Sequence, residues 1–113
     1  MKAAWHSGRG HKATRRKEYQ QALLHYELAL KYEKEEGKTG NGPSPVTLEC
    51  LARTQARLGN YKEALIEAGR SYELYKRLNP SIKIVAESIN RVEAIINSLN
   101  NGSPEDIKKK LNI

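Results

Sequence analysis

The sequence predicts an all-α protein in which antiparallel helical hairpins stack as a short α-solenoid. The first observation is an internal repeat: the tyrosine, alanine and leucine of YQQAL at 19–23 recur in YKEAL at 61–65, 42 residues later. A fixed interval of about this length is typical of helical repeats. The second observation is that apolar residues recur at spacings of three and four over most of the chain, which indicates amphipathic helices. The 113 residues are enough for one domain.

The N-terminal part is expected to contain a weak segment followed by one long helix. Residues 1–13 are basic and weakly helical, because each glycine inside a helix costs about 1 kcal/mol relative to alanine. The apolar stripe from Thr14 to Glu36 predicts a continuous helix. Gly37 ends it, since glycine readily adopts the left-handed conformation. Residues 14–44 are therefore the first repeat and its loop.

The second repeat is predicted at residues 45–80. Ser44-Pro45 indicates a helix start, because the serine oxygen can accept a free backbone N–H and proline needs no acceptor. This helix runs to Leu58. The short Gly59-Asn60 link then folds the next helix back beside it, with Asn60 and Glu63 as a capping pair.

The C-terminal part is read as a degenerate third repeat or as capping helices, residues 81–113. An apolar stripe from Ile82 to Leu99 predicts a fourth helix. Ser103-Pro104 then begins a short final helix, with Ile107 and Leu111 on its apolar side.

Paired helices with a small residue and an aromatic at the turn resemble tetratricopeptide repeats, and the 42-residue interval is similar to the long repeats of kinesin light chains. The resemblance covers roughly residues 14 to 100. The stretches that carry it are YELALKYEKEEGKTGNGPSPVTLECLARTQARLGNYKEAL and SYELYKRLNPSIKIVAESINRVEAI. The same interval places Arg9 opposite the core position Leu51, so the opening helix of the first repeat is expected to be degenerate. The chain begins part-way through an array or carries an unrelated N-terminal segment.

The resemblance implies a non-enzymatic adaptor that binds a partner protein or peptide in a concave groove lined by the first helix of each pair. The implied groove positions are Glu49, Arg53, Arg57, Asn90 and Arg91, extended by Arg15 if a first helix forms. Guanidinium groups pair with carboxylates in a bidentate way, which favours an acidic extended peptide. The alternative interpretation is that these arginines only solvate one face.

Charge favours a second class of function, a basic nucleic-acid-binding protein that uses residues 2–17. Residues 1–17 hold six lysines and arginines and no acid. Such a block attracts nucleic acid, or it is a solvated basic end.

Other site classes are not expected. The histidines have no cysteine or carboxylate at ligand spacing, and Cys50 is the sole cysteine, so we expect no metal site, no cofactor and no catalytic constellation. The longest apolar stretches are interrupted by charges, which predicts a cytoplasmic protein without membrane contact.

Self-association is the third alternative. Ile84 and Ile95 lie off the main apolar stripe of the fourth helix. If both stay uncovered at the end of a repeat array, they form a surface for a homodimer. The alternative is a monomer, on which two exposed isoleucines are common.

Overall fold

A computed structural model describes residues 2–36 and 44–111. These residues form six α-helices and no strand, which confirms the predicted all-α class. The helices are α1 (Lys2–Arg15), α2 (Tyr19–Glu36), α3 (Pro45–Arg57), α4 (Tyr61–Lys76), α5 (Lys83–Asn101) and α6 (Pro104–Leu111). Apart from Ser44, the loop predicted after Glu36 lies outside the described residues.

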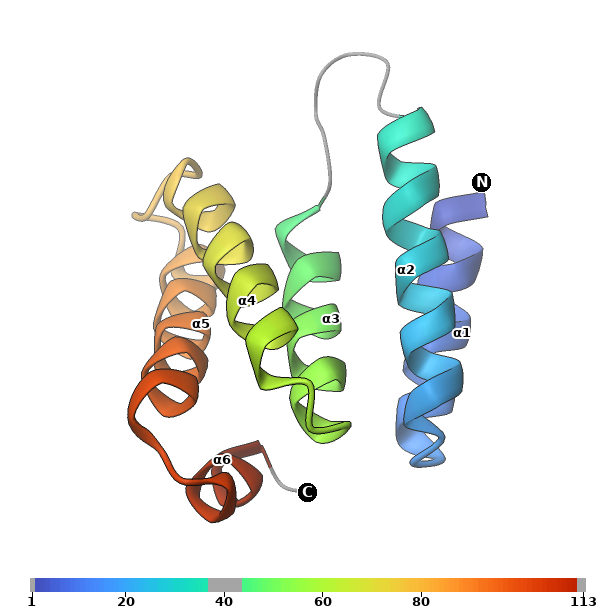
Figure 1. The fold of residues 1–113 in the computed structure, drawn as a ribbon. Helices are drawn as coiled ribbons and strands as arrows, with labels where there is room; N and C mark the ends of the chain where they lie inside the picture. The colour runs from blue at the N-terminus through green and yellow to red at the C-terminus, as the bar shows by residue number, and fades with distance from the viewer. Residues whose placement is uncertain (1, 37–43, 112–113) are drawn as a thin grey trace.

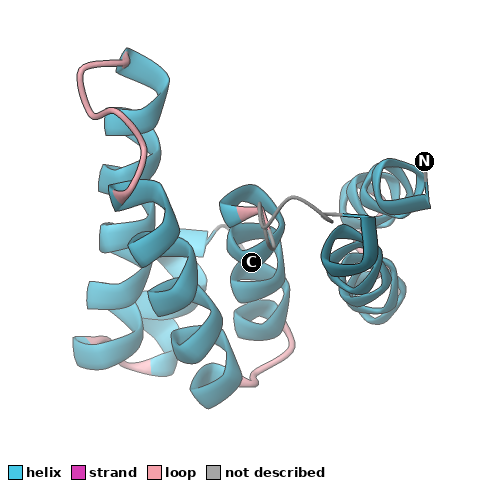
Figure 2. Cartoon of the chain, turned by 90° about the horizontal axis from the view of Figure 1, so that it is seen from above, coloured by secondary structure: helices cyan, strands magenta, loops and turns pink. Residues whose placement is uncertain are grey.

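Neighbouring helices along the chain also lie side by side in space (Figure 1). α1 and α2 form one antiparallel hairpin, called hairpin 1, and α3 and α4 form a second, called hairpin 2. α2 packs on α3, α4 packs on α5, and α6 contacts both α5 and α3. Seen from above, hairpin 1, marked by the N-terminus, stands beside hairpin 2 (Figure 2). The predicted stack of helical hairpins is therefore confirmed.

The two hairpins share one turn geometry. Lys17 and Gly59, 42 residues apart, both have a positive φ, 62° and 84°. In each turn the next backbone N–H closes onto a carbonyl five residues earlier, a bond that is typical of helix ends with one left-handed residue. These bonds run from Glu18 N to Ala13 O at 2.9 Å and from Asn60 N to Gln55 O at 2.8 Å. The 42-residue repeat is thus a repeat of backbone structure.

The predicted continuous helix from Thr14 to Glu36 is wrong, and so is the weak helicity of residues 1–13. α1 ends at Arg15 and α2 begins at Tyr19, so the boundary predicted at residue 14 falls inside α1. Packing explains the difference, because buried Gly10 lets the ring of Tyr26 on α2 approach α1 closely. Contact between the helices offsets the low helix propensity of α1.

The helix starts are partly as predicted. Ser44 caps α3, since its Oγ accepts from Val46 N at 3.1 Å. The predicted cap by Asn60 is wrong: its side chain turns back to α3 and donates to Gln55 Oε1 at 2.8 Å. At α6, Ser103 Oγ accepts from Asp106 N at 3.2 Å and Asp106 Oδ2 accepts from Ser103 N at 3.3 Å, a reciprocal capping box.

The core lies on both sides of α3. Leu51 of α3 belongs to a cluster with hairpin 1, whereas Ala52 and Ala56 belong to a larger cluster that α4, α5 and α6 complete. The smaller cluster is Ala13, Ala22, Tyr26 and Leu51; the larger adds Ala64, Ala68, Tyr75, Val92, Ile95 and Ile107 to the two alanines of α3. The many alanines let helix axes approach closely. α3 is therefore the central helix, and its polar residues are held in fixed positions.

Candidate ligand-binding face

Glu49 is a buried carboxylate, 5% exposed, at a point where three helices meet. Arg91 of α5 donates to both of its oxygens, from Nη2 to Oε1 at 2.9 Å and from Nε to Oε2. Tyr75 of α4 donates its hydroxyl to Oε1 at 2.9 Å. Arg53, one turn along α3, lies 3.5 Å from Oε2. Both oxygens are thus paired, which offsets the cost of burying the charge.

The protonation states of this cluster follow from the same contacts. Burial raises the pKa of Glu49, but the hydrogen bonds from Arg91 and Tyr75 and the charges of Arg91 and Arg53 outweigh burial and lower that pKa below its ordinary value. The hydrogen bond to Glu49 raises the pKa of Arg91. Burial and the charge of Glu49 raise the pKa of Tyr75 to about 12. At neutral pH the carboxylate is ionised, the guanidinium is charged and the phenol is a donor.

The two arginines beside Glu49 are anchored at one side and exposed at another. The side chain of Arg53 is 29% exposed and that of Arg91 is 43% exposed. Arg91 uses Nε and Nη2 for its bonds to Glu49, and Nη2 also donates to Ser88 Oγ at 3.2 Å; among the described residues no acceptor engages its Nη1. One carboxylate therefore orients two guanidinium groups and leaves a net positive charge.

The structure places the other predicted groove residues around this cluster. Arg57 is half-buried, and its guanidinium carbon lies 5.3 Å from the ring centroid of Tyr19 on α2, which joins hairpin 2 to hairpin 1. Asn90 is exposed on α5, and Arg15 is exposed at the end of α1. We call Arg53, Arg57 and Arg91, with Glu49 beneath them, the arginine face. Glu49 itself is a support for the arginines because it is buried.

The predicted self-association surface does not form as a pair. Ile84 is 68% exposed, but Ile95 is 5% exposed and belongs to the larger core cluster with Ile107 of α6. The prediction that Ile95 remains uncovered is wrong, because α6 folds back against α5.

An aromatic and histidine cluster on hairpin 1 was not predicted from the sequence. His6 of α1 stacks on Tyr32 and lies against His25, both on α2, with 3.1 Å between the Nδ1 atoms of the two histidines. Trp5 meets His6 edge-on at 4.8 Å between ring centroids, and the guanidinium of Arg9 lies 4.8 Å over the indole. Trp5 nevertheless remains 55% exposed. The signal in the sequence was the single tryptophan among basic residues, whose face is known only once α1 exists.

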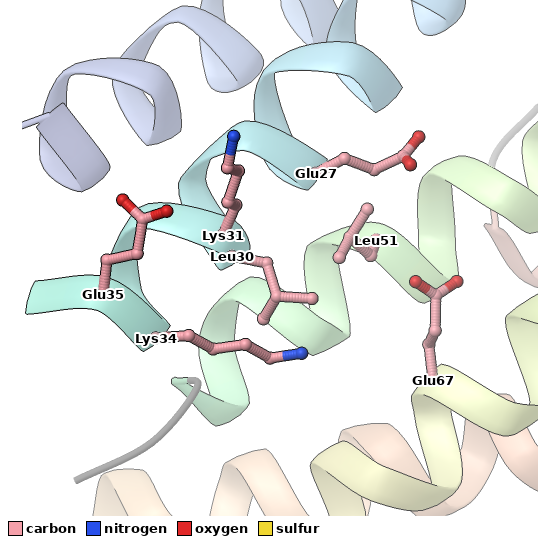
Figure 3. Close-up of a pocket in the computed structure, with 7 residues that line it drawn as sticks. All are labelled: Glu27, Leu30, Lys31, Lys34, Glu35, Leu51 and Glu67. Atoms are coloured by element: carbon pink, nitrogen blue, oxygen red, sulfur yellow. The ribbon is translucent and has the colours of Figure 1, made fainter. Parts of the chain in front are cut away.

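An open hollow of about 420 Å³ lies between α2 and hairpin 2. It is lined by Glu27, Leu30, Lys31, Lys34, Glu35, Leu51 and Glu67. Figure 3 shows Glu27 and Glu67 extending from different helices at one side of it. Burial, together with the charges of Glu27 and Glu63, raises the pKa of Glu67 to about 7, against the opposing effects of Gln55 and Arg70. The mixed charges of this hollow favour no single ligand class.

Comparisons with family models, curated proteins and solved structures found no match to this chain. Within residues 2–36 and 44–111, no three histidine, cysteine or acidic residues gather as metal ligands. In the same ranges no helix has the length and apolar character needed to cross a membrane. The case for a function therefore rests on the arginine face and on the basic end of α1.

Proposed function

We propose that this chain is a protein-interaction module of the tetratricopeptide type, and that its arginine face binds an acidic extended peptide. The observation that carries the proposal is the buried Glu49, which holds Arg53 and Arg91 from two different helices in fixed, partly exposed positions. Fixing the guanidinium groups before binding reduces the entropy that a ligand must remove.

The repeated hairpin supports the module type. The shared turn at Lys17 and Gly59 gives two copies of one helical hairpin, and α5 packs on the second copy. Stacks of this kind present an extended surface across several helices, which suits an extended peptide. The arginine face spans α3 and α5, so a peptide lying across it contacts successive units.

Charge supports an acidic ligand. The face holds three guanidinium groups against one carboxylate, and that carboxylate is buried beneath them. A carboxylate of the ligand gains charge-assisted hydrogen bonds from the exposed N–H groups, and Arg91 Nη1 is a donor that Glu49 does not use.

A peptide-binding assay tests this proposal. A fluorescent pool of random decapeptides rich in aspartate and glutamate is titrated with the chain, and a pool rich in lysine serves as the comparison. We expect the acidic pool to bind, and Arg53→Glu with Arg57→Glu to weaken it by at least about tenfold, because one charge-assisted bond is worth about 1.5 to 3 kcal/mol.

Two further variants control for folding and net charge. Arg53→Gln with Arg57→Gln removes the charges without placing a new acid beside Glu49. Lys62→Glu with Arg77→Glu makes an equal charge change at exposed residues of α4. If the α4 pair weakens binding as much as the arginine pair does, or if the chain binds both pools equally, the proposed face is wrong.

A further inference from the structure

Four side chains form one exposed line along α1. Trp5, Arg9, Lys12 and Arg16 are separated by four, three and four residues, the spacing of neighbours on one helix face. All four are exposed. Arg16 lies just beyond the end of α1, in the turn to α2. We call these four residues the Trp5 stripe.

The indole at one end of the stripe is held in place while more than half of it stays accessible. The ring centroid of Trp5 lies 4.8 Å from His6 and 6.1 Å from His25, both at steep interplanar angles. Arg9 lies over the indole at 4.8 Å. The histidines thus support the edge of the ring, and 55% of the residue remains exposed to solvent. A flat partner can stack on it without unfolding hairpin 1.

The rest of the stripe is a row of positive charge. Arg9, Lys12 and Arg16 border a shallow hollow of about 150 Å³ whose other wall is α2 and the residue before it, with Glu18, Gln21 and His25. Arg9 and Arg16 are seven residues apart, about 10 Å along a helix axis. Glu18 is the acid in this hollow, against three cations. A row of this kind attracts a chain of phosphates.

We propose that the Trp5 stripe binds single-stranded nucleic acid, with a base stacked on Trp5 and backbone phosphates along Arg9, Lys12 and Arg16. An exposed aromatic ring next to a basic track is how such strands are bound without sequence preference. Acidic peptides and anionic lipid headgroups match the cations but offer no base for the indole. Paired bases in a duplex are already stacked, so a single strand fits this surface better.

Trp5 also supplies the measurement, because it is the sole tryptophan of the sequence. A 15-residue oligothymidylate is titrated into the full chain while tryptophan fluorescence is recorded. We expect quenching on binding. The logarithm of the affinity should fall with the logarithm of salt with a slope of about −2, from about −0.7 for each of three phosphate contacts.

Variants separate stacking from charge. Trp5→Leu, followed by anisotropy of a labelled oligothymidylate, should weaken binding at least about fivefold, the lower end of the effect of one stacked base. Lys12→Gln should make the salt slope shallower by about 0.7, and Lys108→Gln, an exposed lysine of α6, should leave it unchanged. Lys12 is exposed, so this variant stays informative if Trp5→Leu disturbs the fold.

Other polyanions decide between partner classes. Polyglutamate and vesicles of phosphatidylserine carry charge without bases, and we expect neither to quench Trp5 as the oligonucleotide does. If the oligonucleotide causes no quenching at low salt, or if polyglutamate binds equally well and Trp5→Leu changes nothing, the stripe is not a nucleic-acid site. A fluorescence change with vesicles alone would assign it to a membrane surface. Arg53→Gln with Arg57→Gln should leave oligonucleotide binding intact, so this proposal and the peptide proposal fail separately.

Discussion

Hairpin 1 and hairpin 2 turn in the same way but fill their interiors differently. In hairpin 1, Gly10 lies against Tyr26, and a Cβ added at Gly10 would lie 2.6 Å from the ring atom Cε1. The residues 42 positions later are Ala52 and Ala68, both buried in the larger core cluster. One hairpin therefore uses a glycine and an aromatic ring where the other uses two alanines. The shared turn tolerates this redistribution of volume between facing helices.

The exchange also changes the chemistry of the interior. The hydroxyl of Tyr26 lies 2.8 Å from His11 Nδ1 and 3.4 Å from Thr14 Oγ1, so hairpin 1 has polar contacts at this position. Ala68 contributes only apolar contact. Hairpin 1 thus depends on directional bonds and close ring packing, and hairpin 2 depends more on apolar burial.

The largest expected effect comes from Gly10→Ala. In an exposed helix this change stabilises by about 1 kcal/mol, but here the new Cβ overlaps the ring of Tyr26, which is 2% exposed and has no room to move. We expect a loss of about 2 kcal/mol from the free energy of unfolding, measured by urea denaturation.

Gly8→Ala is the matched control, because a Cβ at that exposed position meets nothing within 4 Å. It should stabilise the protein by up to about 1 kcal/mol. The clash itself is tested in a Tyr26→Ala background, where Gly10→Ala recreates the alanine pair of hairpin 2. Its cost should disappear there; an equal cost in both backgrounds would contradict the packing described for hairpin 1.

A smaller effect is expected at the shared turn. Lys17 has a left-handed backbone, which costs a residue with a side chain about 1 kcal/mol, whereas Gly59 has the same conformation with little strain. Lys17→Gly should therefore stabilise by about 0.5 kcal/mol, after the larger entropy of the unfolded glycine is subtracted. Thermal unfolding measures it.

The reciprocal change provides the check. Gly59→Ala introduces a Cβ that contacts nothing within 4 Å, so any loss reports backbone strain alone. We expect a loss of about 1 kcal/mol. Opposite signs at Lys17 and Gly59 support the shared turn, and a destabilised Lys17→Gly would argue against it.

The sequence predicted hairpin 2 well because its local signals agree. Ser44 and Pro45 mark the start of α3 and Gly59 marks its end, and apolar spacing identifies the buried side. Hairpin 1 was missed because Lys17 carries no local sign of a turn and Gly10 reads as a helix breaker. Only its partner Tyr26 explains Gly10, and that contact depends on the tertiary structure. The 42-residue interval alone placed Lys17 opposite Gly59.

The candidate site was predictable to a similar degree. The spacing of Arg53 and Arg57 on one helix indicated a common face, which does not require the tertiary fold. The burial of Glu49 and its pairing with Arg91 depend on where α5 lies against α3, and the apolar pattern of α5 does not specify that. The buried position of Ile95 likewise depends on how α6 folds back.

The last prediction concerns one repeat position with two different titratable residues. His25 in hairpin 1 and Glu67 in hairpin 2 are 42 residues apart, and in both the folded protein favours the neutral form. Burial, with the charges of His6 and Arg9, lowers the pKa of His25 from 6.5. Burial raises the pKa of Glu67 from 4.5 to about 7.

These two shifts have opposite consequences for stability. The folded state binds a proton at His25 less readily than the unfolded state does, so its contribution is present above pH 6.5 and is lost as the pH falls through the folded pKa. The folded state binds a proton at Glu67 more readily, so that contribution is present at low pH and is lost as the pH rises from 4.5 to about 7. Acid should weaken hairpin 1 while neutral pH weakens hairpin 2.

Urea denaturation of His25→Gln and Glu67→Gln from pH 4.5 to 8 measures both effects. Each variant removes one titration but keeps a polar side chain of similar size. We expect Glu67→Gln to gain stability over the wild type as the pH rises, and His25→Gln to gain it as the pH falls. Each gain should stay below about 1 kcal/mol, because both residues are partly exposed and water screens their charges. Parallel curves for the wild type and both variants would mean that these residues titrate alike in the folded and unfolded chain, and that the hairpins do not differ in this respect.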